Sequence, residues 1–528
     1  MSLLATTPVD RMDRPYPRRW AALTVLCLSL LIIVMANTSL LVAAPAMTKD
    51  LGLSSSDLQW VIDAYTVPYA ALMLVMGAIG DKYSRRGALL AGLAVFGAGS
   101  VTGSLAHSTA TVIAARAVMG VGAAMIMPAT LSLLTATFPR RERARAITVW
   151  TATSGLAIAA GPLLAGRLLE GHAWGFTFLI NVPVAGVAVL AALALVPPSR
   201  AAVSGRLDLV GGLLSVVFLA SLVYMIIEGP RFGWGATAIG AAVLAGLGLA
   251  GFVAWELRHP RPILDVRRFA DRTFAGANLA VLLFFLAAFG SIYYLTQHLQ
   301  FVLGYGPLAT GVRLLPLAGA VFAGAAVTGV LTPRAGMKVT VIVGMALGTT
   351  GILLLTRVGD GSGYGDFLAP LLLLGLAIGL SVSPCTDAIM GAFPEKQLGV
   401  GGAVNDTSLE LGGSLGIAIL GSILAGTYTS GLDAAIGGRL PAQAADAAGE
   451  SVGGALTVAG KIADPGPAAT LVRAADHAFA HAVAHTSLVG GVILGVGTVV
   501  VALLLPSAAR RTSPDGETAK DARAKVSV

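Results

Sequence analysis

Among the acidic residues inside long apolar runs, where a charge is hardest to keep, three are the leading functional candidates. They are Asp63, in the run 57–80, and Asp406 and Glu410, in the run 400–426. An ionised side chain in a lipid environment is costly, so each of these residues is a functional candidate by default. A carboxyl group shielded from water favours its protonated form, and a second carboxyl nearby strengthens that preference. The chemistry these residues could do is therefore reversible proton binding, with the proton leaving when a cation arrives.

The spacing of Asp406 and Glu410 places both on one face of a helix, because residues four apart lie one turn above each other. The stretch 405–410 reads Asn-Asp-Thr-Ser-Leu-Glu, which is polar enough to line a cavity. Other interpretations remain open. Asp406 could cap a helix end, Glu410 could belong to a structural pair, and Asp63 could be an interfacial carboxylate.

Three arginines, Arg116, Arg167 and Arg313, also lie within the predicted spans, and Arg116 is the main candidate among them. Arg116 could pair with Asp63 or stabilise the deprotonated form of a carboxylate, or its long side chain could reach the membrane interface instead. Other polar and aromatic residues could contact an amphipathic cation, although membrane aromatics often serve packing. These candidates are Asn37, Tyr65, Tyr293, Tyr294 and Gln297.

The composition indicates what must position these residues. Of 528 residues, 56% are hydrophobic and 12% charged, whereas soluble proteins carry about 25% charged residues. The mean hydropathy is +0.82. A soluble enzyme and a disordered protein are both excluded, because the apolar surplus must face lipid. The two cysteines, Cys27 and Cys385, are too few for a disulfide framework or a cysteine-based metal site.

Apolar runs of spanning length recur along the whole chain and predict fourteen transmembrane helices. When the N-terminus is placed inside, most of the 35 Lys and Arg residues fall in inner segments, which follows the positive-inside rule. An even number of spans then leaves both termini in the cytoplasm. The predicted spans are 20–46, 57–80, 87–106, 110–136, 145–169, 174–197, 207–229, 235–257, 273–301, 308–332, 338–357, 366–392, 400–426 and 484–507.

The runs group into five segments. We expect a cytoplasmic N-terminal segment, a six-helix bundle, two extra helices, a second six-helix bundle and a cytoplasmic tail. Within the second bundle, an alanine-rich extracellular connection at 427–485 could be a short helical hairpin or a mobile tether. The segments are 1–19, 20–200, 201–260, 261–507 and 508–528.

An inner loop at the end of the second span carries Gly77, Asp81, Lys82, Arg85 and Arg86. The carboxylate could cap the next helix or pair with a cation across the domain interface. The two arginines could anchor to lipid phosphates. Such a latch, with Asp81 and Arg86 as its pair, would have to break when the inside opens. An ordinary positive-inside loop is the alternative. A similar loop recurs at 329–338, as expected for transporters built from repeats.

The fifth span contains a proline among glycines. Pro162 lacks a backbone donor and is expected to kink its helix. Gly155, Gly161 and Gly166 would let a partner backbone come close. A kinked packing helix without selectivity is the alternative.

Three further functions find no support in the sequence: dinucleotide binding, ATP-driven transport and metal binding. Residues 246–251 match a dinucleotide-binding pattern but lie inside an apolar span without a preceding strand. No phosphate-binding loop of the G-x-x-x-x-G-K-[ST] type occurs, so nothing supports an ATP-driven pump. His477, His481 and His485 share one helical face that could bind zinc, but a solvated face is the preferred interpretation, and we expect no metal site.

Several motifs together carry a resemblance to one family. Residues 77–86 resemble the inner-loop signature of the major facilitator superfamily, with Ser84 where a glycine is usual. Arg116 with Gly120 and Gly122 resembles the fourth-helix signature, and 161–166 resembles the fifth-helix signature of antiporters. Residues 59–65 and 178–183 resemble the fourteen-helix drug:proton antiporter family (QacA/EmrB/LfrA-like).

This resemblance implies an all-α integral membrane protein with the major facilitator fold, in which two extra central helices join two six-helix bundles. It implies proton-coupled export of amphipathic, often cationic compounds by alternating access, with carboxylates at Asp63, Asp406 and Glu410 involved in coupling. It also implies no cofactor, because the proton gradient drives transport. The first-helix carboxylate usual in that family is absent, since Ala36 occupies its place.

Two other functions stay open. One is a narrow exporter of a single antibiotic or metabolite on the same fold, which Ala36 favours. The other is a membrane-embedded sensor or enzyme, for which the sequence offers no catalytic arrangement. For either kind of exporter, broad or narrow, we expect a monomer in the plasma membrane. It would contact lipid, protons and small substrates but no nucleic acid.

Overall fold

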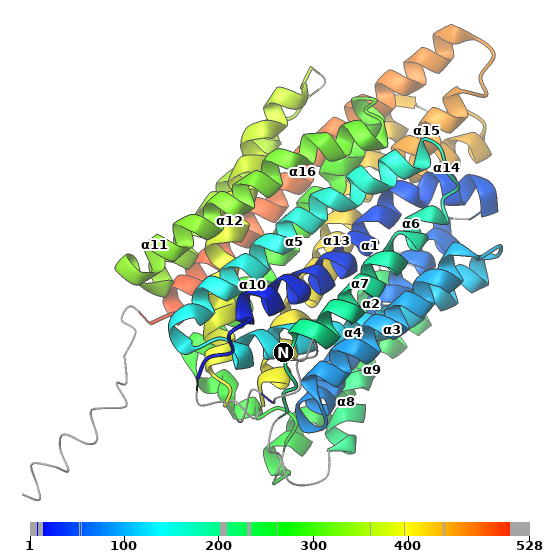
Figure 1. Cartoon of the computed structure of the whole chain (residues 1–528). Helices are drawn as coiled ribbons and strands as arrows, with labels where there is room; N and C mark the ends of the chain where they lie inside the picture. Colours follow the sequence, from blue (N-terminus) through cyan, green and yellow to red (C-terminus); the bar gives the residue numbers. More distant parts are fainter. Residues whose placement is uncertain are drawn as a thin grey trace, which may run out of the picture.

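A computed structural model describes residues 8, 14–51, 53, 55–200, 208–229, 234–260, 262–359, 361–394, 397–436, 438 and 440–506. Helices account for all the regular structure in these ranges. Long helices run alongside one another through the molecule, and the short helices α14 and α15 lie at one end (Figure 1).

The N-terminal helices are α1 Arg19–Leu51, α2 Ser55–Lys82, α3 Arg85–Ser104, α4 Thr109–Thr137, α5 Arg140–Leu169, α6 Phe176–Leu179 and α7 Asn181–Leu195. Two further helices follow, α8 Leu209–Glu228 and α9 Ala236–Arg258. The C-terminal helices are α10 Arg272–Gln297, α11 Pro307–Leu354, α12 Tyr364–Gly391, α13 Leu398–Ile436, α14 Ala442–Glu450, α15 Val452–Ala459 and α16 Pro465–Leu504. Short 3₁₀ or π turns are η2 Val266–Ala270, η3 His298–Val302 and η4 Leu355–Arg357.

Thirteen helical segments in the described part of the chain are long and apolar enough to cross a membrane. One of them contains α11, whose 48 residues are interrupted at Gly336, with φ 83° and ψ 163°. A positive φ of this size is readily adopted only by glycine. Since about 20 residues cross a bilayer core, α11 is long enough to cross twice. The chain is thus a multi-pass membrane protein, and its helices are consistent with the fourteen expected spans.

The beginnings of α1, α3 and α5 and the ends of α2 and α4 define what we call the basic end of the bundle. Arg19, at the start of α1, makes two hydrogen bonds of 2.7 and 2.9 Å to Glu142, near the start of α5. Nearby, the guanidinium of Arg145 lies 5.3 Å from the Trp20 ring. These contacts fasten the first turn of α1 to α5.

The helix α8 packs beside α2, and α9 packs against α8. The rings of Trp60 on α2 and Tyr224 on α8 are 6.1 Å apart. Gly248 of α9 approaches the backbone of Phe218 on α8, where an added Cβ would lie 2.9 Å from its nitrogen. The pair is therefore attached to the rest of the protein mainly through α2, the helix that also carries the inner-loop motif, and α8 makes further contacts with α13.

At the end opposite the basic end, the connection between α13 and α16 is largely helical. The hydroxyl of Tyr428, on α13, donates to the carbonyl of Ala448 on α14 at 3.0 Å. Thr429 donates to Gly449 at 2.9 Å. The short helices α14 and α15 are thus fixed to the extension of α13, although whether this end is extracellular remains a prediction.

Candidate functional site

The inner-loop motif forms a buried contact between the N-terminal and C-terminal helices at the basic end. One oxygen of Asp81 pairs with Arg85 at 2.7 Å, and the other accepts the backbone N–H of Gly399 at 2.6 Å. The Asp81 side chain is 4% exposed and that of Arg85 is 2% exposed. Gly399 is the second residue of α13. A carboxylate at this position therefore also lies at the positive end of that helix dipole.

Close approach of two backbones makes this contact feasible. A Cβ added to Gly77 would lie 2.5 Å from the carbonyl oxygen of Gly399, closer than any side chain tolerates. The glycines at both positions therefore allow α2 and α13 to touch. We call the set Gly77, Asp81, Arg85 and Gly399 the latch.

The structure corrects three expectations for the inner loop. Asp81 does not cap the next helix, because Ser84 is the N-cap of α3 and accepts from Gly87. The ion pair of Asp81 is with Arg85, not Arg86, whose guanidinium donates to the Leu193 carbonyl at 3.2 Å.

Nor does Arg85 reach out to lipid phosphates. It is buried and donates to the Ser199 hydroxyl at 3.0 Å. The remaining cation of the motif, Lys82, is half-buried at the end of α2 and lies 5.1 Å from the Tyr83 ring.

A second cluster surrounds Arg116, about two turns from the start of α4. Its side chain is fully buried, so the expectation that it reaches the membrane interface is wrong. It donates to the carbonyls of Val61 at 3.0 Å and Ile62 at 3.3 Å, and to the Asn37 side-chain oxygen at 3.1 Å. Arg116 thus ties α1, α2 and α4 together. Its guanidinium also lies 4.4 Å from the centre of the Tyr65 ring, a cation–π contact.

The acidic pair lies on α13. Asp406 is fully buried, and one of its oxygens accepts from Asn405 at 2.9 Å. Asn405 in turn accepts from Thr386 on α12 at 2.9 Å. The other oxygen of Asp406 has no hydrogen-bond partner within the described residues. The expectation of a helix cap at Asp406 is wrong, because α13 begins at Leu398, about two turns earlier.

Glu410 lies one turn beyond Asp406 and is half-buried. Its carboxyl group lies within electrostatic range of Asp406 and of Tyr65 and Tyr69 on α2. The rings of the two tyrosines are 5.5 Å apart. Since Tyr65 also contacts Arg116, the three elements α4, α2 and α13 bring a cation, two phenols and two carboxyls together. We call Arg116, Tyr65, Tyr69, Asp406 and Glu410 the central cluster.

The other candidates separate into two groups. Asn37 joins the central cluster through Arg116. Tyr294 does not, because it is fully buried and its hydroxyl bonds to Ser291 and to Ser487 on α16, so its place is in helix packing. Tyr293 and Gln297 hydrogen-bond to each other and lie along α10, where Tyr293 is near Gly421.

Asp63 belongs to α2, but its side chain is outside the described part of the structure. Arg116 donates to the carbonyls of Val61 and Ile62, the two residues that precede Asp63 in the chain. The pairing of Arg116 with Asp63 therefore stays a prediction.

The glycines of α5 each contact another helix. A Cβ on Gly155 would meet Val321 at 2.8 Å, and one on Gly166 would meet the backbone of Leu308 at 2.8 Å, both on α11. A Cβ on Gly161 would collide with Thr38 of α1 and lie 2.9 Å from the Met35 carbonyl. Pro162 is buried within the helix, and the preceding carbonyl accepts from Ser39 of α1 at 3.2 Å.

We expect Gly161→Ala to impair transport, because the added methyl group would push α1 away from α5 and with it the Asn37 contact to Arg116. Overpacking of this kind costs about 1–3 kcal/mol. The matched control is Gly186→Ala on α7, where nothing lies within 4 Å of the added carbon. Equal transport rates in the two variants, measured in proteoliposomes, would contradict the prediction.

Comparison with known proteins identifies the family. The chain matches the model of the Major Facilitator Superfamily over residues 26–417. This protein belongs to the major facilitator superfamily. It is 34% identical to the multidrug efflux pump LfrA of Mycolicibacterium smegmatis, over 92% of this chain and 96% of LfrA. The family and these relatives indicate a transporter.

Two further relatives of this superfamily member differ in the compounds named in their titles. One is the methyl viologen resistance protein SmvA of Salmonella typhimurium, 32% identical over 89% of this chain and 95% of SmvA. The other is the tetracenomycin C resistance and export protein of Streptomyces glaucescens, 30% identical over 94% of this chain and 93% of that protein.

The fold also matches a solved transporter structure. The human organic anion transporter MFSD10 (TETRAN) superposes with a TM-score of 0.59, covering 91% of this chain and all of MFSD10 at 16% identity. At this identity the match supports the fold alone. The major facilitator fold expected from the sequence is thus confirmed.

Proposed function

We propose that this protein is a proton-coupled efflux antiporter that exports amphipathic, cationic compounds from the cytoplasm by alternating access. The observation that carries the proposal is the central cluster. Glu410 on α13 lies within electrostatic range of Asp406 and of Tyr65 and Tyr69 on α2, and Arg116 contacts the Tyr65 ring, all within the membrane-spanning helices. Proton-binding and cation-binding groups therefore share one place between N-terminal and C-terminal helices.

In this mechanism Glu410 is the group that exchanges a proton for substrate. A protonated carboxyl is neutral and leaves the phenol rings of Tyr65 and Tyr69 to water or lipid. A substrate cation that stacks on those rings favours the ionised carboxylate, so its arrival expels the proton. Asp406 stays next to Glu410 and opposes the ionisation of both at once.

Arg116 has a supporting role. Hydrogen bonds to the Val61 and Ile62 carbonyls and to Asn37 hold it in place, so its charge is fixed beside the Tyr65 ring. When Glu410 is deprotonated and no substrate is bound, this charge lowers the cost of the ion in the membrane. Asp63 belongs to the same set through the resemblance of its motif to the drug:proton antiporters.

The latch controls access. Positive charge is concentrated at the basic end, so we place that end and both termini in the cytoplasm, in the plasma membrane. An intact latch then corresponds to a closed cytoplasmic side. Opening that side requires the bond between Asp81 and the start of α13 to break, while α5 and α11 slide along their glycine contacts.

We further propose a monomer of two bundles, 20–200 and 261–507, with the extra pair at 201–260 between them. It performs no catalysis and binds no nucleic acid. It needs no cofactor, because the proton gradient drives the cycle. Its partners are substrate, protons and membrane lipid.

A second candidate is a narrow exporter of one antibiotic or metabolite. Two observations favour it. Ala36 stands where the drug:proton antiporters have a carboxylate, which leaves fewer acidic contacts for varied cations. One relative is named for resistance to a single compound, tetracenomycin C.

The test uses purified protein in liposomes that carry an imposed pH gradient. We expect ethidium, methyl viologen and a quaternary ammonium compound each to move in the direction opposite to the proton flow. A protonophore should stop this transport. Transport of a single compound from a broad panel would establish the narrow exporter. No gradient-driven movement of any compound would contradict both candidates.

A further inference from the structure

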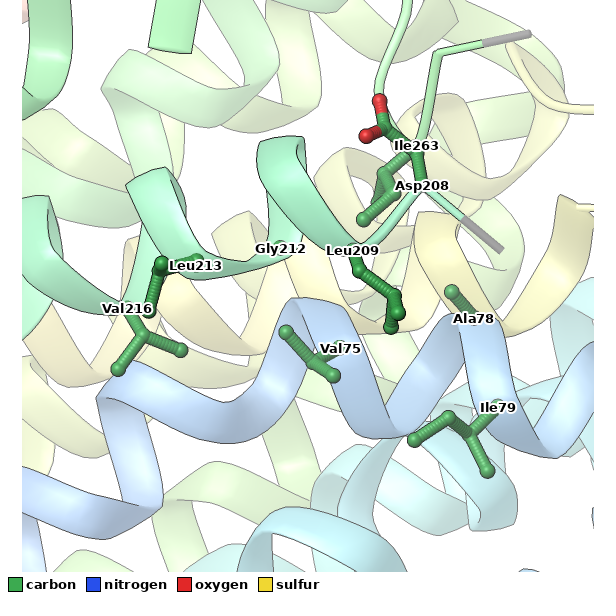
Figure 2. A pocket seen from close by; sticks show the side chains of 9 residues that line it. All are labelled: Val75, Ala78, Ile79, Asp208, Leu209, Gly212, Leu213, Val216 and Ile263. Atoms are coloured by element: carbon green, nitrogen blue, oxygen red, sulfur yellow. The ribbon is translucent and has the colours of Figure 1, made fainter. Parts of the chain in front are cut away.

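A groove lies between α2 and α8 at the basic end, away from the central cluster. It encloses about 240 Å³. Figure 2 shows its side chains, which come from the last turns of α2, the first turns of α8 and the segment before η2. Its lining residues are Val75, Ala78, Ile79, Asp208, Leu209, Gly212, Leu213, Val216 and Ile263.

Two apolar stripes form its walls. Val75, Ala78 and Ile79 repeat at helical spacing on α2, and Leu209, Gly212, Leu213 and Val216 do so on α8. Gly212 keeps the floor open, because a Cβ there would already lie 3.2 Å from a methyl group of Val75. The groove therefore depends on a missing side chain.

The groove opens to the membrane. Leu209 is 74% exposed and Leu213 is 64% exposed, and both belong to a helix apolar enough to cross a bilayer. Because this helix is a candidate membrane span, we place its exposed leucines against lipid. Since the groove occupies the first two turns of α8, it lies within the leaflet at the basic end.

Among the described lining residues, the one with a charged side chain already has hydrogen-bond partners within the chain. Asp208 accepts from the backbone N–H of Gly211 at 2.8 Å and from the Trp255 indole at 2.9 and 3.0 Å. A cationic substrate would have to displace these donors. The volume is also below the roughly 300–1,000 Å³ of pockets that enclose drug-sized ligands. An occupant that is narrow, flexible and wholly apolar fits better.

We propose that the groove binds one acyl chain of a phospholipid from the leaflet at the basic end. In this proposal Lys82 and Arg258, the last residues of α2 and α9 at the basic end, would bind the lipid phosphate. The acyl chain fills the space between the two helices and holds α8 against α2.

The bound lipid would support the latch from behind. Val75 and Ile79 are each two residues from Gly77 and Asp81, so they point to the opposite side of α2. The latch contacts α13 on one face of α2, while the acyl chain packs on the other. Loss of the lipid is expected to loosen α2 where the latch requires it to be fixed.

Photolabelling tests this site without any assumption about transport. The protein is reconstituted in vesicles of phosphatidylethanolamine and phosphatidylglycerol that include a phosphatidylglycerol with a mid-chain diazirine. After irradiation, mass spectrometry locates the label. We expect it to concentrate on Val75–Ile79 and Leu209–Val216, severalfold above the exposed surface of α9.

Gly212→Trp fills the groove and is expected to reduce that label severalfold. The control Gly246→Trp adds the same side chain on α9, where nothing lies within 4 Å. Val216→Trp serves as a second filling variant if Gly212→Trp does not fold. Even labelling of the groove and α9, or unchanged labelling in a folded filling variant, would overturn the proposal. So would displacement of the label by excess methyl viologen, which would assign the groove to substrate.

Discussion

Replacing Glu410 with glutamine is expected to abolish substrate-driven proton movement and to leave the protein folded. Glutamine keeps the shape and the hydrogen-bonding reach of the side chain but cannot release a proton. In the wild type, acidification should weaken cation binding, because protons compete for Glu410 beside Asp406, Tyr65 and Tyr69. In the variant, affinity should change with pH by less than tenfold over the same range, a difference under about 1.4 kcal/mol.

The measurement is substrate affinity at several pH values, together with exchange of labelled for unlabelled substrate across a vesicle membrane. Exchange needs no net proton movement, so the Glu410→Gln variant should retain it. Glu450→Gln is the matched control, because Glu450 is exposed at the end of α14. A variant at Glu410 that couples as well as this control would show that the proton travels elsewhere.

Removing the Asp81 carboxylate is expected to have the second largest effect. Asp81→Ala leaves the Arg85 guanidinium buried without its ion pair and the start of α13 without its acceptor. Breaking a buried pair from one side costs about 3–5 kcal/mol. The conformation with an intact latch should therefore lose most of its population to the one that is open at the basic end.

Spin labels at Tyr83 and Gly391 report this change, since both positions are exposed at the basic end. The two native cysteines, Cys27 and Cys385, are replaced first. We expect the distance distribution to lengthen in Asp81→Ala and to recover in part in Asp81→Ala/Arg85→Leu, which leaves no unpaired charge. A distribution that is the same in wild type and Asp81→Ala would contradict the role of the latch.

The sequence predicted the features that depend on periodicity and on the cost of charge in lipid. The apolar runs predicted the membrane-spanning helices, because the thickness of the bilayer core sets the length of an apolar run that can span it. The i, i+4 spacing of Asp406 and Glu410 placed them on one face of α13, and the structure has them interacting there. Such signals are local, so a single sequence carries them.

The features that depend on partners distant in sequence could not be predicted. Nothing near Asp81 points to Gly399, which is more than three hundred residues away. The sequence allowed Arg116 to reach the membrane interface. Its backbone carbonyl acceptors on α2 are brought next to it only by the fold, so the sequence could not indicate them. Tyr69 was missed altogether, although its i, i+4 spacing from Tyr65 was a usable signal.

The central claim is that substrate and proton compete for Glu410. The most direct test adds a transported cation to purified protein in a weakly buffered solution and follows a pH-sensitive dye. We predict that the wild type releases protons on substrate addition and that Glu410→Gln, at a concentration that gives the same substrate occupancy, releases none. Equal proton release from both proteins would contradict the account.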